Sequence, residues 1–178
     1  YSVAHIVTVI LEMPTGALAD LLGRKKTMIL GCLTWVIGYG LIAQQTGAWM
    51  LWAGYLINAI GSALFSGSDV ALYYDSLKEL DREDEFSKYQ AQKSLFFRIG
   101  LVLATFAGAT VYKFYPRLPY SFYSFLTLVM GLMTWLYQEP QIDTEKFSFK
   151  NYLYQTKQGV KQLTKSTYIK DFSLFYLA

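Results

Sequence analysis

Apolar residues along this chain gather in long runs that are separated by short polar segments. Several of these runs reach the length of about 20 residues that an α-helix needs to cross the hydrocarbon core of a bilayer. A water-soluble protein of this size would instead spread its charges along amphipathic elements. The pattern therefore predicts an all-α membrane protein with five membrane-spanning helices and the beginning of another, at residues 3–18, 27–43, 49–74, 94–112, 120–137 and 171–178.

Composition supports this class and excludes several others. Hydrophobic residues make up 53% of the chain and charged residues only 16%, against about 25% charged residues in soluble domains. A single cysteine and a single histidine leave no paired-cysteine or histidine-rich metal site. No phosphate loop, dinucleotide fingerprint or HExxH motif is present. We therefore expect no enzyme, no metal, no cofactor and no nucleic-acid partner.

Basic residues are sorted between the two sides of the predicted spans. Segments 20–26, 75–93 and 138–170 together hold thirteen lysines and arginines, whereas the loops on the other side hold only Lys113 and Arg117. Cytoplasmic loops of membrane proteins carry this excess of Lys and Arg. The three segments are therefore expected to be cytoplasmic, in a multi-pass protein of the plasma membrane.

The most distinctive polar segment is the run 16–26, called the signature turn below, between the first two spans. Its two glycines allow close backbone approach or conformations that other residues avoid. Its acid can accept backbone N–H groups at a helix N-terminus, and its basic residues hold the turn on the cytoplasmic side. The residues concerned are Gly16, Gly23, Asp20, Arg24 and Lys25.

The signature turn resembles the G-x-L-A-D-[RK]-x-G-[RK]-[RK] loop of the major facilitator superfamily. It departs from that pattern at Leu21, where a basic residue is usual, and matches it at Gly16, Leu18, Ala19, Asp20, Gly23, Arg24 and Lys25. The resemblance implies a transmembrane helix bundle in which 1–137 holds helices 2–6 of the N-terminal six-helix half. It also implies a cytoplasmic central loop over 138–170 and the start of helix 7 over 171–178. Within that loop the helical spacing of Phe149, Leu153, Val160 and Leu163 predicts an amphipathic helix on the membrane surface. A C-terminal half of the same chain would complete the bundle.

The resemblance also assigns a contact to the signature turn. The family commonly has an acid at the cytoplasmic end of the helix that corresponds to the third span, and Asp75 stands there. An ion pair between Arg24 and Asp75, with Asp20 nearby, is therefore expected. Such a cluster would hold a cytoplasmic gate closed in one state and release it in the other.

A polar stripe follows one side of the third span, with offsets of four, eight and eleven residues from its first member. Its members are Asn58, Ser62, Ser66 and Asp69. Polar residues inside a membrane face protein or a water-filled cavity rather than lipid, and the resemblance implies that this helix lines the central cavity. They are candidates for contact with solute or proton. The alternative for Asn58 and the serines is hydrogen bonding to neighbouring helices or to their own backbone.

Three charged residues are predicted at similar depth in the cytoplasmic half, namely Glu12, Asp69 and Arg98. Pairing of Arg98 with one of the acids would offset the cost of burying both charges. A carboxylate without a partner could carry a proton, and a fixed structural ion pair is the alternative. Stripes of small residues on the third and fourth spans predict helix packing faces. They comprise Ala59, Ala63, Gly67, Ala71, Gly100, Ala104 and Gly108.

On this resemblance the function expected is secondary transport of a small organic solute by alternating access, driven by a proton gradient or by the gradient of the solute itself, with export favoured over import. The partners implied are the solute, protons and the lipid bilayer. The arginine that many proton-driven drug antiporters carry early in this helix is missing from 55–61. A non-transporting receptor, scaffold or assembly protein is the alternative, and a membrane enzyme would need a catalytic constellation that this sequence lacks.

Overall fold

The computed structural model describes residues 2–44 and 46–139, with the side chains of 2–6, 9–10 and 12–13 excluded. These residues form helices joined by short turns, with no strand among them, which confirms the all-α prediction. The predicted loop 138–170, except its first two residues, and the predicted span 171–178 lie outside the described residues. The elements are α1 (Ser2–Leu22), α2 (Arg24–Gln44), α3 (Ala48–Glu79), the short 3₁₀ helix η1 (Glu83–Glu85), α4 (Phe86–Phe114) and α5 (Leu118–Leu136).

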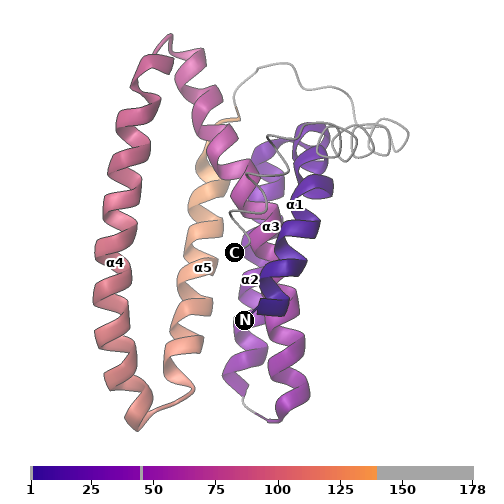
Figure 1. The fold of residues 1–178 in the computed structure, drawn as a ribbon, viewed down its shortest axis with the longest axis vertical. Helices are drawn as coiled ribbons and strands as arrows, with labels where there is room; N and C mark the ends of the chain where they lie inside the picture. Colours follow the sequence, from indigo (N-terminus) through magenta and orange to yellow (C-terminus); the bar gives the residue numbers. More distant parts are fainter. Residues whose placement is uncertain (1, 45, 140–178) are drawn as a thin grey trace.

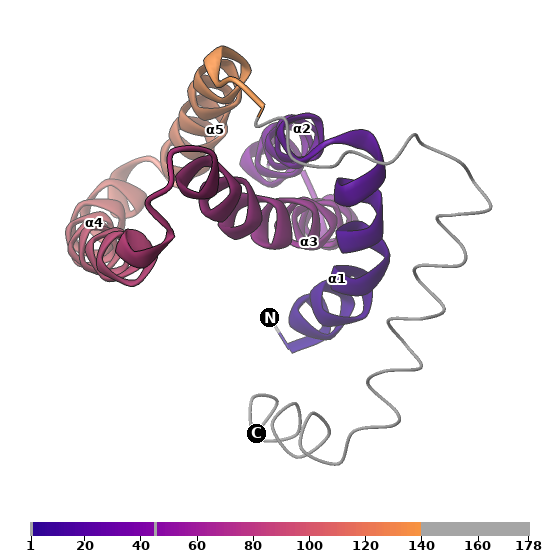
Figure 2. The ribbon, with the colours of Figure 1, turned by 90° about the horizontal axis from the view of Figure 1, so that it is seen from above.

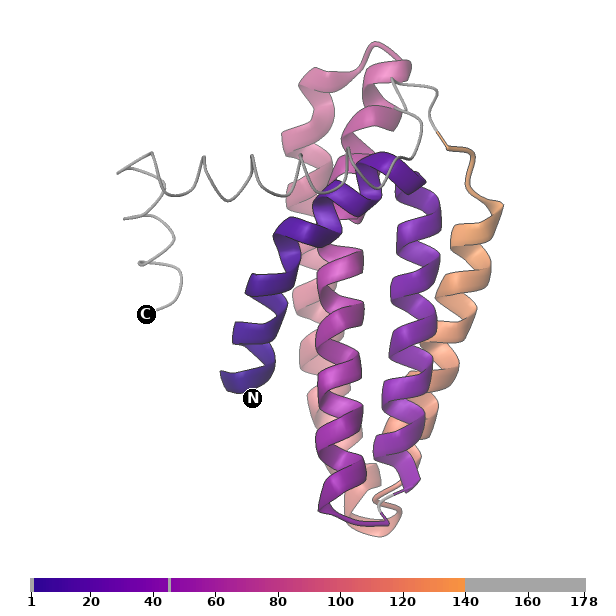
Figure 3. The same cartoon turned by 90° about the vertical axis from the view of Figure 1, so that its right-hand side faces the viewer.

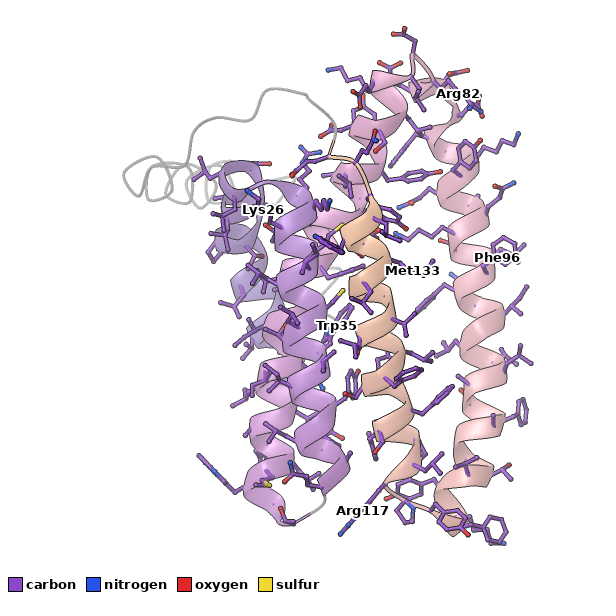
Figure 4. The ribbon with its side chains drawn as sticks, turned by 180° about the vertical axis from the view of Figure 1, so that it is seen from behind. Lys26, Trp35, Arg82, Phe96, Arg117 and Met133 are labelled. Atoms are coloured by element: carbon purple, nitrogen blue, oxygen red, sulfur yellow. The ribbon has the colours of Figure 1, made fainter. Side chains whose placement is uncertain are left out.

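The long helices run up and down, so that successive turns alternate between two ends of the bundle (Figure 1). The turns after α1 and α3 lie at one end, and those after α2 and α4 lie at the other. Lys26 and Arg82 project at the first end, called the basic end below, and Arg117 at the opposite end (Figure 4). The described part of the chain therefore has the alternation that the basic-residue count predicts.

Three stretches of the described chain are long and apolar enough to cross a membrane. They are Arg24–Gln44, Ala48–Glu79 and Glu83–Phe114. The predicted spans 3–18 and 120–137 are helical, as α1 and α5, but they are not among these three.

Two predicted loops are shorter than the sequence suggested. The loop expected over 75–93 is mostly helix, because α3 continues to Glu79 and α4 begins at Phe86. The signature turn is reduced to Gly23, which alone separates α1 from α2. A helix satisfies its own backbone hydrogen bonds and Lys and Glu favour it. Charged residues therefore mark where the apolar run ends, and the helix continues past them.

A compact polar cluster closes the turn between α3 and α4. Asp81 has φ of 54°, a left-handed conformation that Asp tolerates better than most residues. Arg82 Nε and Nη2 donate to the two carboxylate oxygens of Glu85 at 2.7 and 2.8 Å, and Nη2 also donates to the Tyr89 hydroxyl at 3.1 Å. These hydrogen bonds to Glu85 raise the pKa of Arg82.

Helices α2 and α3 form the centre of the bundle and approach each other through glycines (Figure 2). A Cβ added at Gly31 would lie 3.1 Å from Gly61 O, and one added at Gly38 would lie 2.9 Å from Gly54 O. In each helix the two glycines are seven residues apart, which is two helical turns. The antiparallel helices therefore meet backbone to backbone at two levels.

Helix α1 packs on the other side of α3, and its direction changes along its length (Figure 3). Pro14 lies inside α1, where it removes a backbone hydrogen bond and bends the helix. Thr15 Oγ1 donates to Ala63 O at 2.9 Å. The buried Ala59 and Ala63 therefore behave as the packing face that the small-residue stripe predicted, and α1 covers that face.

Helix α5 packs on α2, whereas α4 stands apart from the central pair (Figures 1 and 2). Ser124 Oγ donates to Val36 O at 2.9 Å, which ties α5 to α2. No residue of α4 is buried, and Phe96 points away from the other helices (Figure 4). A Cβ at Gly100 or Gly108 would meet nothing within 4 Å. Among the described residues, the predicted packing stripe of α4 therefore has no partner helix.

Candidate gate site

The centre of the candidate site is Arg24, the first residue of α2. Its Nη1 donates to Asp75 Oδ2 near the end of α3, so the structure contains the predicted ion pair. Its Nη2 lies 3.8 Å from Asp20 Oδ1 on α1. The side chains of Arg24 and Asp75 are 26% and 16% exposed, and that of Asp20 is 58% exposed. One guanidinium thus joins three helices at the basic end.

Gly23 gives the turn its shape. Its φ is +96°, in the region that favours glycine. Its N–H donates to Ala19 O at 3.1 Å, and its carbonyl accepts from the N–H and the hydroxyl of Thr27 at 3.2 and 3.0 Å. Gly16 was expected to have a similar role, but its φ is not positive and a Cβ there would meet nothing within 4 Å. Among the described residues, therefore, Gly23 is the glycine of the signature turn whose conformation and surroundings require a glycine, and Gly16 is not.

Glu139, just beyond α5, also reaches the turn, and the sequence reading missed it. Its Oε1 accepts from the backbone N–H of Lys25 at 3.4 Å. In the described part of the chain, Glu139 is thus the carboxylate that accepts a backbone N–H at the start of α2, a role that the sequence had suggested for Asp20. The available signal was an acid at the end of a span, directly before Pro140, on the side where basic residues prevail.

An open depression of about 700 Å³ lies beside the Arg24–Asp75 pair. Ser66 from the predicted polar stripe lines it, together with Gly67, Val70, Ala71, Tyr74 and Phe86. Ser66 therefore borders the same depression as the Arg24–Asp75 ion pair.

Two other members of the stripe face α2 instead of this depression. Asn58 is only 8% exposed, and its Oδ1 is buried against Gly38 without a hydrogen-bond partner among the described residues. Ser62 Oγ donates to Asn58 O at 3.0 Å and accepts from Trp35 Nε1 at 3.3 Å. Ser62 therefore follows the alternative of hydrogen bonding to a neighbouring helix and its own backbone, whereas Asn58 packs against α2 with its Oδ1 unbonded among the described residues.

Asp69 pairs with Lys93 of α4. The two side chains are 25% and 50% exposed, and Asp69 lines a second depression of about 390 Å³. Arg98, the expected partner, makes no ion pair with any side chain that the structure describes. Glu12 lies on α1, but its side chain is outside that description. Lys93 was assigned to a loop by its charge, although it belongs to α4, where it reaches Asp69.

We expect a double-mutant cycle to separate Lys93 from Arg98. The pair of Asp69→Asn and Lys93→Gln should show a coupling free energy of about 0.5–1 kcal/mol, the range of partly exposed ion pairs. The matched pair of Asp69→Asn and Arg98→Gln should show none. Thermal unfolding of the purified full-length variants measures both. Coupling to Arg98 in place of Lys93 would contradict the observed pairing.

An antiparallel bundle of long helices, three stretches of which are apolar enough to cross a membrane, defines the class of helical membrane proteins. The family model described as Major Facilitator Superfamily matches residues 1–177. The chain belongs to this superfamily, which is one of transporters and not of enzymes.

Several curated proteins resemble parts of the chain. Multidrug resistance protein MdtH of Photorhabdus laumondii is 31% identical over 90 residues, 51% of this chain and 22% of the relative. The methylenomycin A resistance protein of Bacillus subtilis is 40% identical over 98 residues, 52% of this chain and 21% of the relative. An uncharacterised transporter of Buchnera aphidicola is 29% identical over 175 residues, 97% of this chain and 42% of the relative. The matched segments therefore span less than half of each relative's length. No solved structure matches the chain.

Proposed function

We propose that this chain belongs to the N-terminal half of a secondary transporter that exports a small organic solute across the plasma membrane by alternating access, coupled to protons. Membership of the superfamily supports transport. The relatives named for multidrug resistance and for methylenomycin A resistance support export as the direction. A second six-helix half would complete the protein and place the solute between the halves.

The observation that carries the proposal is the position of Arg24 between Asp20 and Asp75. The three charges come from three helices and all remain partly exposed. Partly exposed ion pairs contribute little net stability, about 0–1 kcal/mol, so a contact of this kind can break and re-form at small cost. In the proposed cycle it is made while the cytoplasmic side is closed and broken when that side opens.

Ser66 and Asp69 are the members of the polar stripe best placed for solute and proton. Ser66 borders the depression next to the gate, and Asp69 borders a second one beside Lys93. In the proposal, protonation of Asp69 releases Lys93 and thereby loosens α4 from α3. Exchange of a proton for a solute at such a site is the chemistry that an antiporter needs.

The test is export by the full-length protein in bacteria that lack their main drug exporters. Accumulation of a lipophilic dye and resistance to a drug panel that includes methylenomycin A are measured with and without a protonophore. The wild type should lower accumulation only while the proton gradient stands. Asp20→Asn should abolish most of this export while the amount of folded protein is unchanged.

A matched control is Asp84→Asn, which removes an exposed acid at the same end of the bundle and should leave export intact. Unchanged export by Asp20→Asn would contradict the gate assignment. A folded full-length protein that moves no compound, in cells or in reconstituted vesicles, would favour the scaffold or receptor alternative.

A further inference from the structure

Glu139 contacts the backbone of the signature turn. Its Oε1 accepts from the N–H of Lys25 at 3.4 Å. A Cβ added at Gly23 would lie 2.9 Å from Cδ and from Oε2 of Glu139. The carboxylate therefore fills the space that the missing side chain of Gly23 leaves open.

The contact is electrostatically favourable for two reasons. The first backbone N–H groups of α2 have no partner within the helix, and the helix dipole favours a negative charge there. The run Arg24, Lys25, Lys26 adds three positive charges to the same helix start. Arg24 is already engaged by Asp20 and Asp75. Glu139 supplies a further carboxylate to the same turn.

We propose that Glu139 is a positioning residue for the gate. By holding the start of α2 from the end of α5, it keeps the Gly23 turn in its conformation and Arg24 directed at Asp75. The signature turn is then clamped by acids of three different elements: α1, α3 and the segment after α5. The transport consequence rests on the proposed function, whereas the structural coupling does not.

Gly23 makes the proposal testable, because two separate requirements meet at this residue. Its positive φ strains any other residue, whatever the space around it. A Cβ would in addition displace the Glu139 carboxylate. In the wild type, Gly23→Ala therefore both strains the backbone and displaces the Glu139 carboxylate. In a Glu139→Ala background it imposes only strain, because the carboxylate is already absent.

The experiment is a thermal-unfolding cycle on the purified full-length protein in lipid nanodiscs. Glu139→Ala should lower Tm, and Gly23→Ala should lower Tm by clearly less in the Glu139→Ala background than in the wild type. Glu79→Ala, which removes an exposed acid at the same end, should lower Tm little and leave the effect of Gly23→Ala unchanged. Equal effects of Gly23→Ala in the two backgrounds would overturn the clamp. If Gly23→Ala does not fold, Gly23→Asn replaces it, because Asn tolerates positive φ better.

Transport gives the readout that a merely structural contact would not move. Glu139→Gln keeps the size and one acceptor but removes the charge, and it should lower kcat about two- to tenfold, the range expected for one charge at a helix start, with KM unchanged. In an Asp75→Asn background it should add no further loss. Additive losses would overturn the positioning role. Because the unfolding cycle needs no transport, a failure of the clamp is distinguishable from a failure of the proposed transport function.

Discussion

Gly38→Leu is expected to be among the most damaging single substitutions in the described chain, with a loss of stability of about 2–3 kcal/mol or a failure to fold. The reason is the backbone contact between α2 and α3. A Cβ at residue 38 would lie 2.9 Å from Gly54 O, and it would also overlap the buried side chain of Asn58. A backbone carbonyl cannot turn aside as a flexible side chain can, so the two helices must separate. Thermal unfolding and the yield of monodisperse protein in detergent measure the effect.

Gly40→Leu is the matched control, two residues along the same helix. A Cβ there would meet nothing within 4 Å. The helix propensity of leucine is also more favourable than that of glycine, by about 0.8 kcal/mol. Gly40→Leu should therefore leave Tm unchanged or raise it slightly. Similar losses for both variants would mean that glycine matters to α2 for a reason other than contact with α3.

The close approach of α2 and α3 was only half visible in the sequence. Gly31 and Gly38 stand within an apolar run, where a membrane helix tolerates glycine. Their partners Gly54 and Gly61 have the same spacing of seven residues, but the antiparallel register that pairs them depends on tertiary packing. The existence of the helices followed from their apolar runs, because length and hydropathy are local properties. Their ends did not, because charge marks the membrane boundary and not the end of a helix.

The candidate site could be predicted where a motif fixed both partners. Arg24 and Asp75 were expected to meet because the resemblance places both at the cytoplasmic end, and the structure contains that pair. The polar stripe on α3 was less informative. Its spacing shows which side chains share a face of the helix, but not which neighbouring helix packs against that face. Asn58 and Ser62 face α2, whereas Ser66 lines the open depression.

Glu139 was beyond the reach of local patterns. Its contact with Lys25 joins residues 114 positions apart. Glu139 also lies beyond the apolar run of α5, and a search for membrane spans does not consider residues outside such runs. Lys93 was missed for a related reason. A lysine at the end of a charged stretch was taken as a loop residue, although on a continuing helix it points back to Asp69.

Arg24→Met should reduce transport about tenfold or more, because the closed gate loses its ion pair. A tenfold loss in rate corresponds to roughly 1.4 kcal/mol less stabilisation of the rate-limiting step. The substitution keeps much of the side-chain length but leaves Asp75, only 16% exposed, without its cation. Loss of one partner from a partly buried pair costs about 2 kcal/mol, between the values for exposed and buried pairs. Vesicle transport and thermal unfolding of the full-length variant measure the two effects. A variant with normal transport would remove Arg24 from the gate.

The charge-swapped variant Arg24→Asp/Asp75→Arg separates stability from gating. Arg24 begins α2 and Asp75 lies in the last turns of α3, so the native charges oppose both helix dipoles, and the swap places each charge where its dipole favours it. We therefore expect the swap to recover part of the Tm that Arg24→Asp alone loses, because the new aspartate also meets the like charges of Asp20 and Glu139. Transport should stay low, because an aspartate at position 24 would face Asp20 with a like charge. Full recovery of transport by the swap would show that the pair alone forms the latch and that Asp20 takes no part in it.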